Sequence, residues 1–338
     1  MPDFSIAVDL GGTNLRIAAV STDGEMLEKV TLGTNLASGP DHVVSEMCDA
    51  ILRLSGKYRG GGSFLGVGAG IPGVLDLEAG TVRKSANLPG WSGYPVREEI
   101  ERRLGAQFFL DNDGNMAALG EQWLGAARDV PNMAMLTLGT GIGGAIMLNG
   151  KMFHGMNGMA GEFGHVPIEP EGVPCGCGSH GCAERYASAT AVVRMAREAI
   201  ASGAAPGLVK AATDAEFGAK SVYNLAMEGD EDARRIFRRF GKALGMLLAG
   251  MVNGLNLEMY VIGGGVSSAW DAFAPSMFEE LRERALVYAV TEPDAVSGED
   301  EAAARVRARS GRKTIVTRAL LGSDAGLYGA ARMAVVGA

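Results

Sequence analysis

The sequence opens with a pattern that returns in its middle. Residues 4–32 predict three antiparallel strands, SIAVDL, LRIAAV and MLEKVTL, with turns at Gly11-Gly12 and Asp23-Gly24. Later, the predicted strand MAMLTL leads into Gly139-Thr140-Gly141, and AIMLNGKMF predicts a strand, an Asn149-Gly150 turn and a second strand. A glycine loop thus follows the first strand of each half. This recurrence indicates a diverged internal duplication of one α/β unit.

The length of the chain agrees with two such units. A chain of 338 residues is too long for one ordinary core, so we expect two domains of roughly 100–200 residues each. The first half also predicts a helix over about 41–54, buried strands at FLGVGAG and QFFL, and a helix from Asn112 or Asp113 to about Ala127. The second half predicts helices over about 189–202, 231–254 and 271–286, strands at MYVIGGG and KTIVTRA, and a last helix after Gly322.

Composition excludes several classes of protein. Hydrophobic residues make up 47% and charged residues 21%, which is typical of a globular protein. The net charge of -8 argues against electrostatic binding of nucleic acid. The sequence shows no basic segment followed by an apolar one, the pattern of a secretion signal. The apolar stretch 243–257 is too short to span a bilayer. We therefore expect a cytoplasmic protein that binds no membrane. The charged stretch 291–312 predicts an exposed loop or a solvated helix.

The two glycine loops suggest phosphate binding. Phosphate oxygens need converging backbone N–H groups, and glycine permits the close approach. The loop Asp9-Leu10-Gly11-Gly12-Thr13 offers this, together with a hydroxyl donor and a carboxylate able to hold hydrated Mg²⁺. Alone, it is equally compatible with an ordinary glycine hairpin. Its recurrence as Gly139-Thr140-Gly141 favours two hairpins that clasp a polyphosphate.

The sequence does not support a dinucleotide-binding site or a P-loop. Gly139, Gly141 and Gly144 fit the spacing G-x-G-x-x-G, but a strand follows them where a dinucleotide site requires a helix. The sequence also lacks G-x-x-x-x-G-K-[ST], so it is not a P-loop protein. Gly263-Gly264-Gly265 follows a predicted strand and precedes a helix. It could let a flat base lie against the backbone, or it could be a tight strand-to-helix turn.

A carboxylate stands where α/β proteins place their ligands. Asp111-Asn112-Asp113 ends an apolar strand and opens a helix. A carboxylate at this position can take the proton of an attacking hydroxyl, as phosphoryl transfer requires. Helix capping is the alternative, and Asp113 could serve equally well in that role.

A cluster of cysteines predicts a metal site. Cys175, Cys177 and Cys182 crowd into a glycine-rich loop that follows His165. One imidazole and three thiolates complete the tetrahedral shell of a structural Zn²⁺, although His180 competes with His165 for the fourth position. Glu162 and Glu184 flank the cluster, and carboxylates beside a rigid loop are suited to hold vicinal sugar hydroxyls.

Together these motifs resemble the ROK family of bacterial sugar kinases and repressors. The resemblance runs almost the whole length, in order. Its five motifs are Asp9-Leu-Gly-Gly-Thr13, Asn112-Asp113, Leu138-Gly-Thr-Gly-Ile-Gly-Gly144, Glu162-x-x-His165 and Cys175-x-Cys177-x4-Cys182-x-Glu184. It implies an α/β fold with two actin-like (ribonuclease H-like) domains and an active-site cleft between them. The smaller would comprise residues 1–117 and about 319–338, and the larger, residues 118–318 with the zinc loop.

The resemblance also implies roles for individual residues. Asp113 would be the general base. The residues implied to contact the sugar are Asn87, Asn112, Asp113, Glu162, His165 and Glu184. The residues implied to bind ATP, with Mg²⁺, are Asp9, Gly11, Gly12, Thr13, Gly139, Thr140, Gly141, Gly264 and Gly265. The implied zinc ligands are His165, Cys175, Cys177 and Cys182.

The resemblance leaves alternatives for the substrate and the class of protein. The expected reaction transfers a phosphoryl group from ATP to the 6-hydroxyl of glucose, but N-acetylglucosamine, mannose or fructose would present similar hydroxyls, and polyphosphate could replace ATP. A sugar-responsive repressor is disfavoured, because only eight residues precede Asp9 and leave no room for a helix-turn-helix module. Gly114 and Met116 depart from the family pattern, and 291–312 resembles an insertion. We expect a homodimer or homotetramer.

Overall fold

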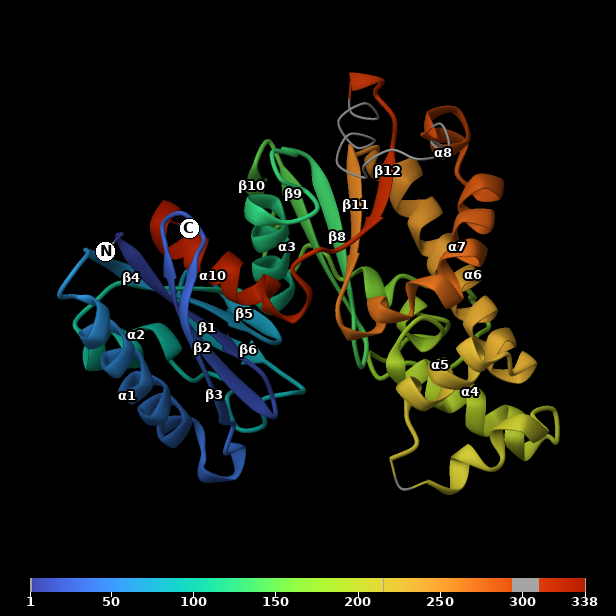
Figure 1. The fold of residues 1–338 in the computed structure, drawn as a ribbon, viewed down its shortest axis with the longest axis horizontal. Helices are drawn as coiled ribbons and strands as arrows, with labels where there is room; N and C mark the ends of the chain where they lie inside the picture. The colour runs from blue at the N-terminus through green and yellow to red at the C-terminus, as the bar shows by residue number, and fades with distance from the viewer. Residues whose placement is uncertain (1, 215, 294–309, 338) are drawn as a thin grey trace. The chain divides into compact units, whose positions relative to one another are not determined.

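The computed structural model describes residues 2–214, 216–293 and 310–337. The chain divides into two compact units (Figure 1). The first comprises residues 1–131, 145–161 and 320–338, and the second comprises residues 132–144 and 162–319. This division differs from the expected boundary at residues 117 and 118, because the helix α3 (Asp113–Leu124) crosses that point without a break. The domain limits given above stay a prediction.

The first unit is built on a five-stranded sheet. In sheet order its strands are β3 (Met26–Gly33), β2 (Asn14–Ser21), β1 (Phe4–Leu10), β4 (Phe64–Ile71) and β7 (Phe108–Asn112). The strands β1, β2 and β3 form an antiparallel meander, which confirms the prediction for residues 4–32. The strands β4 and β7 run parallel to β1, and their register aligns Asp9, Gly70 and Asp111. The carboxyl ends of these three strands therefore meet at one edge of the sheet.

Helices cover both faces of this sheet. On one face Ile6 and Val8 of β1 share a buried core with α1 (Pro40–Tyr58) and α2 (Val96–Leu104). On the other face Ala7 packs with α3 and α10 (Ala325–Val336). Glycine allows α10 to lie close to the sheet, because a Cβ at Gly68 of β4 would overlap the carbonyl oxygen of Ala330.

A second five-stranded sheet repeats the same strand order. Its strands, in order, are β10 (Lys151–Met152), β9 (Ile142–Leu148), β8 (Met133–Leu138), β11 (Met259–Gly263) and β12 (Ile315–Arg318). The strands β8, β11 and β12 belong to the second unit, whereas β10 and the end of β9 fall in residues 145–161, which belong to the first. As in the first sheet, the first strand in sequence is central, the next two lie on one side, and the last two lie parallel to it on the other. The shared order confirms the prediction that one α/β arrangement occurs twice in the chain.

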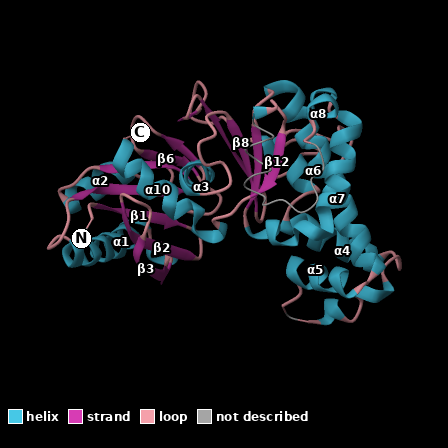
Figure 2. Cartoon of the chain, turned by 45° about the horizontal axis from the view of Figure 1, so that its top comes forward, coloured by secondary structure: helices cyan, strands magenta, loops and turns pink. Residues whose placement is uncertain are grey.

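Several helices accompany the strands of the second unit. The helices α6 (Glu231–Leu255) and α7 (Trp270–Arg284) pack on each other and lie beside the sheet (Figure 2). The unit also contains α4 (Ala189–Ala201), α5 (Ala219–Glu228) and α8 (Leu286–Thr291). The helices α4, α6, α7 and α10 confirm the helices expected from the sequence.

Several elements were not expected. These are α2, α5, α8 and the two-stranded sheet of β5 (Val74–Asp76) and β6 (Thr81–Lys84). The helix α3 ends at Leu124, short of the expected Ala127. The expected exposed segment 291–312 lies largely outside the described residues. Among the described residues, none of the helices combines the length and the hydropathy that a membrane-spanning helix requires.

Candidate functional site

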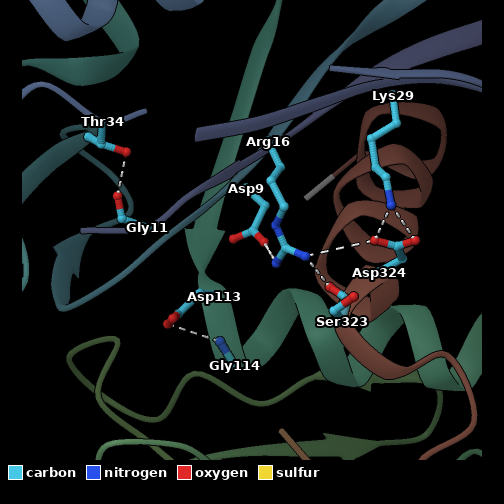
Figure 3. Close-up of polar contacts among 9 residues, drawn as sticks. All are labelled: Asp9, Gly11, Arg16, Lys29, Thr34, Asp113, Gly114, Ser323 and Asp324. Carbon is cyan, nitrogen blue, oxygen red and sulfur yellow. Dashed lines mark hydrogen bonds and ion pairs between the residues drawn. The ribbon is translucent and has the colours of Figure 1, made fainter. Parts of the chain in front are cut away.

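The first glycine loop follows β1 in the first unit. Asp9 stands near the end of β1, and its carboxylate accepts a hydrogen bond from Arg16 of the neighbouring strand (Figure 3). Arg16 also donates to the carbonyl oxygen of Ser323 at 2.6 Å, which ties Asp9 to the segment before α10. Burial raises the pKa of Asp9, and the Arg16 guanidinium opposes that rise. Figure 3 shows the second oxygen of Asp9 pointing away from Arg16.

The turn of this loop brings an expected sugar contact close to it. The N–H of Gly11 donates to the carbonyl of Asn14 at 2.8 Å, and Thr34 Oγ1 donates to the carbonyl of Gly11 at 2.8 Å (Figure 3). A Cβ at Gly12 would lie 3.0 Å from the backbone oxygen of Asn87. Thr13, at the tip, is exposed. The absence of a side chain at Gly12 therefore lets Asn87 approach the loop.

The structure shows which residue provides the N-cap of α3 and where the Asp113 carboxylate lies. Asn112 is the N-cap residue, and its Oδ1 accepts from the N–H of Gly114 at 2.8 Å. Its Nδ2 donates to the carbonyl of Gly73 at 3.1 Å. Asp113 is the first helical residue and is exposed, with an oxygen 3.1 Å from the same Gly114 nitrogen (Figure 3). Asn112 is therefore the N-cap residue, Asp113 accepts from the same Gly114 N–H, and the role of Asp113 as general base stays a prediction.

The buried acid Asp111, beside Asp113, has hydrogen-bond partners that were not expected from the sequence. Asp111 accepts hydrogen bonds at one oxygen from the N–H of Asn112 at 2.7 Å and from Asn115 Nδ2 at 2.8 Å. Its other oxygen accepts from His154 Nε2 at 2.6 Å. The hydrogen bond to Asp111 raises the pKa of His154. No local pattern links residues 43 positions apart, so His154 could not be paired with Asp111 from the sequence.

The second glycine loop joins β8 to β9 in the second unit. The N–H of Gly139 donates to the carbonyl of Gly141 at 3.0 Å, and the N–H of Ala189 at the start of α4 donates to the carbonyl of Gly139 at 2.8 Å. Thr190, also not anticipated, donates its hydroxyl to the carbonyl of Thr140. The N-terminus of α4 therefore fixes this loop, while the Thr140 side chain stays exposed.

The second loop also abuts an expected sugar contact. A Cβ at Gly141 would lie 2.5 Å from Glu184 Oε2. In contrast, a Cβ at Gly139 would meet nothing within 4 Å. Each glycine loop thus touches, through one glycine, a residue expected to bind sugar: Gly12 touches Asn87 and Gly141 touches Glu184. This parallel between the two units was not apparent in the sequence.

The predicted metal ligands come together in the second unit. Ligand atoms of His165, Cys175, Cys177 and Cys182 all lie within 4.8 Å of one another, and among the described residues His180 is not part of this group. Cys177 Sγ and Cys182 Sγ are 3.6 Å apart, and Cys175 Sγ is 3.7 Å from His165 Nδ1. Tetrahedral bonds of about 2.3 Å to zinc place two sulfur ligands ~3.7 Å apart. The donor set and its spacing therefore fit Zn²⁺.

The two glutamates lie on either side of His165. Glu184 Oε1 is 3.7 Å from His165 Nδ1 and 3.2 Å from Cys175 Sγ. Glu162 Oε2 is 3.9 Å from His165 Nε2. The Nδ1 nitrogen thus faces the thiols, and Nε2 faces Glu162. His165 can therefore serve the cysteine cluster with one nitrogen and a bound hydroxyl with the other.

The glycine turn after β11 has a structural requirement of its own. Gly264 has a φ of 81°, which other residues adopt with strain, and a Cβ there would lie 2.5 Å from the backbone of Leu138. Gly265 has open space at its Cβ position. The tight turn alone explains Gly264. Contact of Gly264 and Gly265 with an adenine ring stays a prediction.

Known proteins resemble this chain over most of its length. The ROK family model matches residues 5–335. A glucokinase of Halalkalibacterium halodurans is 38% identical over 83% of this chain and 86% of its own length, and a glucokinase of Thermotoga maritima is 39% identical over 84% and 87%. The structure of a ROK family glucokinase from Streptomyces griseus, in complex with glucose and AMPPNP, is 30% identical, covers 98% of both chains and has a TM-score of 0.76. This likeness confirms the predicted actin-like, ribonuclease H-like fold class. The chain belongs to the ROK family.

Proposed function

We propose that this protein is an ATP-dependent kinase that phosphorylates the 6-hydroxyl of glucose. Two relatives at 38–39% identity are glucokinases, and the Streptomyces griseus glucokinase is solved with glucose and an ATP analogue. The observation that carries the proposal is the exposed carboxylate of Asp113, which stands at the carboxyl end of β7 while Asn112 caps the helix. Such a carboxylate is suited to accept a proton from a bound hydroxyl.

In the proposed mechanism Asp113 accepts the proton of the 6-hydroxyl as the oxygen attacks the γ-phosphate in line. The residues expected to hold the sugar are Asn87, Asn112, Glu162, His165 and Glu184. The Gly11-Gly12-Thr13 and Gly139-Thr140-Gly141 loops would hold the polyphosphate of ATP through backbone N–H groups. Asp9 would hold hydrated Mg²⁺ through the oxygen that points away from Arg16. Bound Mg²⁺ would neutralise charge on the β- and γ-phosphates.

We also propose that the cysteine cluster holds a structural Zn²⁺. With His165, Cys175, Cys177 and Cys182 as ligands, all four positions of a tetrahedral ion would be filled, so no zinc-bound water would be available for activation. The metal would instead fix the loop that carries Glu184 and orient His165 toward the sugar. Groups that lie behind the contacting residues of a site commonly orient those residues in this way.

The glycine loops give a prediction that separates nucleotide binding from sugar binding. Neither Gly139 nor Gly141 has a positive φ, so alanine fits both backbones. Gly139→Ala should raise the KM for ATP by up to about tenfold, equivalent to one lost hydrogen bond, and leave the KM for glucose unchanged. Gly141→Ala should raise both constants, because its Cβ displaces the Glu184 carboxylate. Steady-state kinetics with each substrate varied in turn would measure this.

The outcome of this comparison is decisive in either direction. An equal rise of both constants in Gly139→Ala, with an unchanged melting temperature, would contradict a nucleotide role for the loop. An unchanged KM for glucose in Gly141→Ala would contradict a role of Glu184 in sugar binding.

The proposed function is tested by an assay that couples ADP release to a measurable signal over a panel of sugars. We expect the highest kcat/KM with glucose, and lower values with N-acetylglucosamine, mannose and fructose. Substitution of polyphosphate for ATP should abolish sugar 6-phosphate formation. A higher value with another sugar would reassign the substrate, and the absence of turnover with every sugar, despite sugar binding by calorimetry, would favour a sugar-responsive regulator.

We further propose that the enzyme acts in the cytoplasm, where ATP is available, as a homodimer or homotetramer without nucleic acid as a partner. The net charge of -8 supports the last point, because it opposes binding to a polyanion. Light scattering coupled to size-exclusion chromatography would give the number of subunits.

A further inference from the structure

The hydrogen bonds of Asp111 connect three parts of the first unit. Asp111 is the fourth residue of β7 and is 4% exposed. Its Oδ1 accepts from the N–H of Asn112 and from the side chain of Asn115 in the first turn of α3. Its Oδ2 accepts from His154, which follows β10 at a distant point of the sequence. One buried carboxylate therefore joins β7, the first turn of α3 and the segment after β10.

This arrangement fixes the backbone from which Asp113 projects. Asp113 lies between Asn112 and Asn115, and both of those residues donate to Asp111 Oδ1. The orientation of the Asp111 carboxylate thus sets the orientation of the strand-to-helix junction. His154 is the partner that holds the opposite oxygen, with its Nε2 at 2.6 Å from Asp111 Oδ2. His154 is the member of the network that holds Asp111 from outside the junction.

We infer that His154 is a positioning residue for the general base: it holds Asp111 so that the β7–α3 junction directs the Asp113 carboxylate at the sugar hydroxyl. The inference rests on the proposed role of Asp113. His154 itself makes no contact with the reacting atoms in this scheme. Its side chain is 32% exposed, so it can be replaced without opening a fully buried cavity.

The segment that carries His154 adds a second connection. The N–H of Ala160 donates to the carbonyl of His154 at 3.1 Å, and the chain passes from the first unit to the second between Gly161 and Glu162. Glu162, an expected sugar contact, therefore follows His154 by eight residues. The backbone of His154 thus anchors, within the first unit, the stretch of chain that leads to Glu162, and the His154 substitutions leave that hydrogen bond in place.

A double-mutant cycle tests the inference. A misplacement of a reacting group by about 1 Å can cost ~10²-fold, so His154→Ala should lower kcat by up to about 10²-fold while the KM for ATP stays within about twofold. In an Asp113→Asn background the same change should have little further effect on kcat, because no base remains to be positioned. His154→Gln, which keeps an N–H donor, should recover part of the lost kcat. His42→Ala, on an exposed histidine of α1, is the matched control and should leave kcat unchanged.

The outcomes distinguish this inference from the proposed function. If Asp113→Asn keeps near wild-type turnover, the assignment of the base fails. If Asp113→Asn abolishes turnover but His154→Ala lowers kcat by the same factor in both backgrounds, the base stands and the positioning role is overturned. A wild-type kcat in His154→Ala overturns it as well. Melting temperatures of all variants identify any loss of kcat that arises from unfolding. If His154→Ala unfolds, the His154→Gln variant provides the test. Full loss of kcat in a folded His154→Gln protein would contradict a role of His154 as a hydrogen-bond donor.

Discussion

Replacement of Asp113 by asparagine is expected to lower kcat by ~10²–10⁴-fold, the usual effect of removing a general base. Asparagine has nearly the same size and keeps an oxygen that can face the Gly114 nitrogen, but it cannot accept the proton of the sugar hydroxyl. Asn112 remains the N-cap residue, so α3 should keep its first turn. Glucose binding, measured by calorimetry without nucleotide, should therefore change little while turnover collapses.

The matched control is Asp49→Asn, which makes the same chemical change at an exposed position of α1. Its kcat should equal that of the wild type. Near wild-type turnover in Asp113→Asn would mean that this carboxylate is not the base, and the proposed mechanism would have to be abandoned. Loss of both turnover and glucose binding would instead assign Asp113 to substrate binding.

The second large effect is expected at the cysteine cluster. Cys177→Ser should lose zinc, because a serine hydroxyl is a much poorer ligand than a thiolate. Sugar binding should weaken by about 10- to 100-fold, the range found when groups that orient an active site are removed. Nucleotide binding should survive, since the Gly139 loop is held independently by the N-terminus of α4. Zinc is measured by elemental analysis, and each ligand affinity by calorimetry.

Two controls sharpen this test. His180→Ala should retain zinc, because among the described residues His180 is not in the group of converging ligand atoms. Cys48→Ser changes a buried thiol of α1 in the other unit and should leave the zinc content unchanged. Wild-type protein with less than about half an equivalent of zinc would count against the site. Zinc lost from His180→Ala but kept in His165→Ala would show that the other histidine is the ligand.

Local signals explain what the sequence could predict. The Asp23-Gly24 and Asn149-Gly150 turns, together with alternating apolar residues, were sufficient for the strands around both glycine loops, because turn chemistry and side-chain period act over a few residues. The helix α2 was missed because its polar sequence VREEIERRL buries only Val96 and Ile100 and offers little apolar periodicity.

Contacts between distant residues explain what could not be predicted. Asn87 was named only through the family resemblance, and nothing near it in the sequence shows that its backbone meets Gly12. The Asp111–His154 pair spans 43 positions and depends on the tertiary fold. The cysteine cluster was an intermediate case. Three thiols close together in the sequence predicted a metal site, whereas the grouping of His165 rather than His180 with these thiols depends on the path of the loop.

The position of α10 at the end of the chain affects the order in which the two units can complete their folding during synthesis. This helix completes the first unit: Ser5 donates its hydroxyl to the carbonyl of Ala331, and Gly68 of β4 lies against Ala330. During translation the strands β1 to β7 emerge first, yet the apolar face that α10 covers must stay uncovered until the whole second unit has left the ribosome. The second unit, which is continuous apart from 145–161, can fold earlier. The unit made first is therefore finished last, and Ala7, Ala18 and Val20 lack their contacts with α10 throughout that interval.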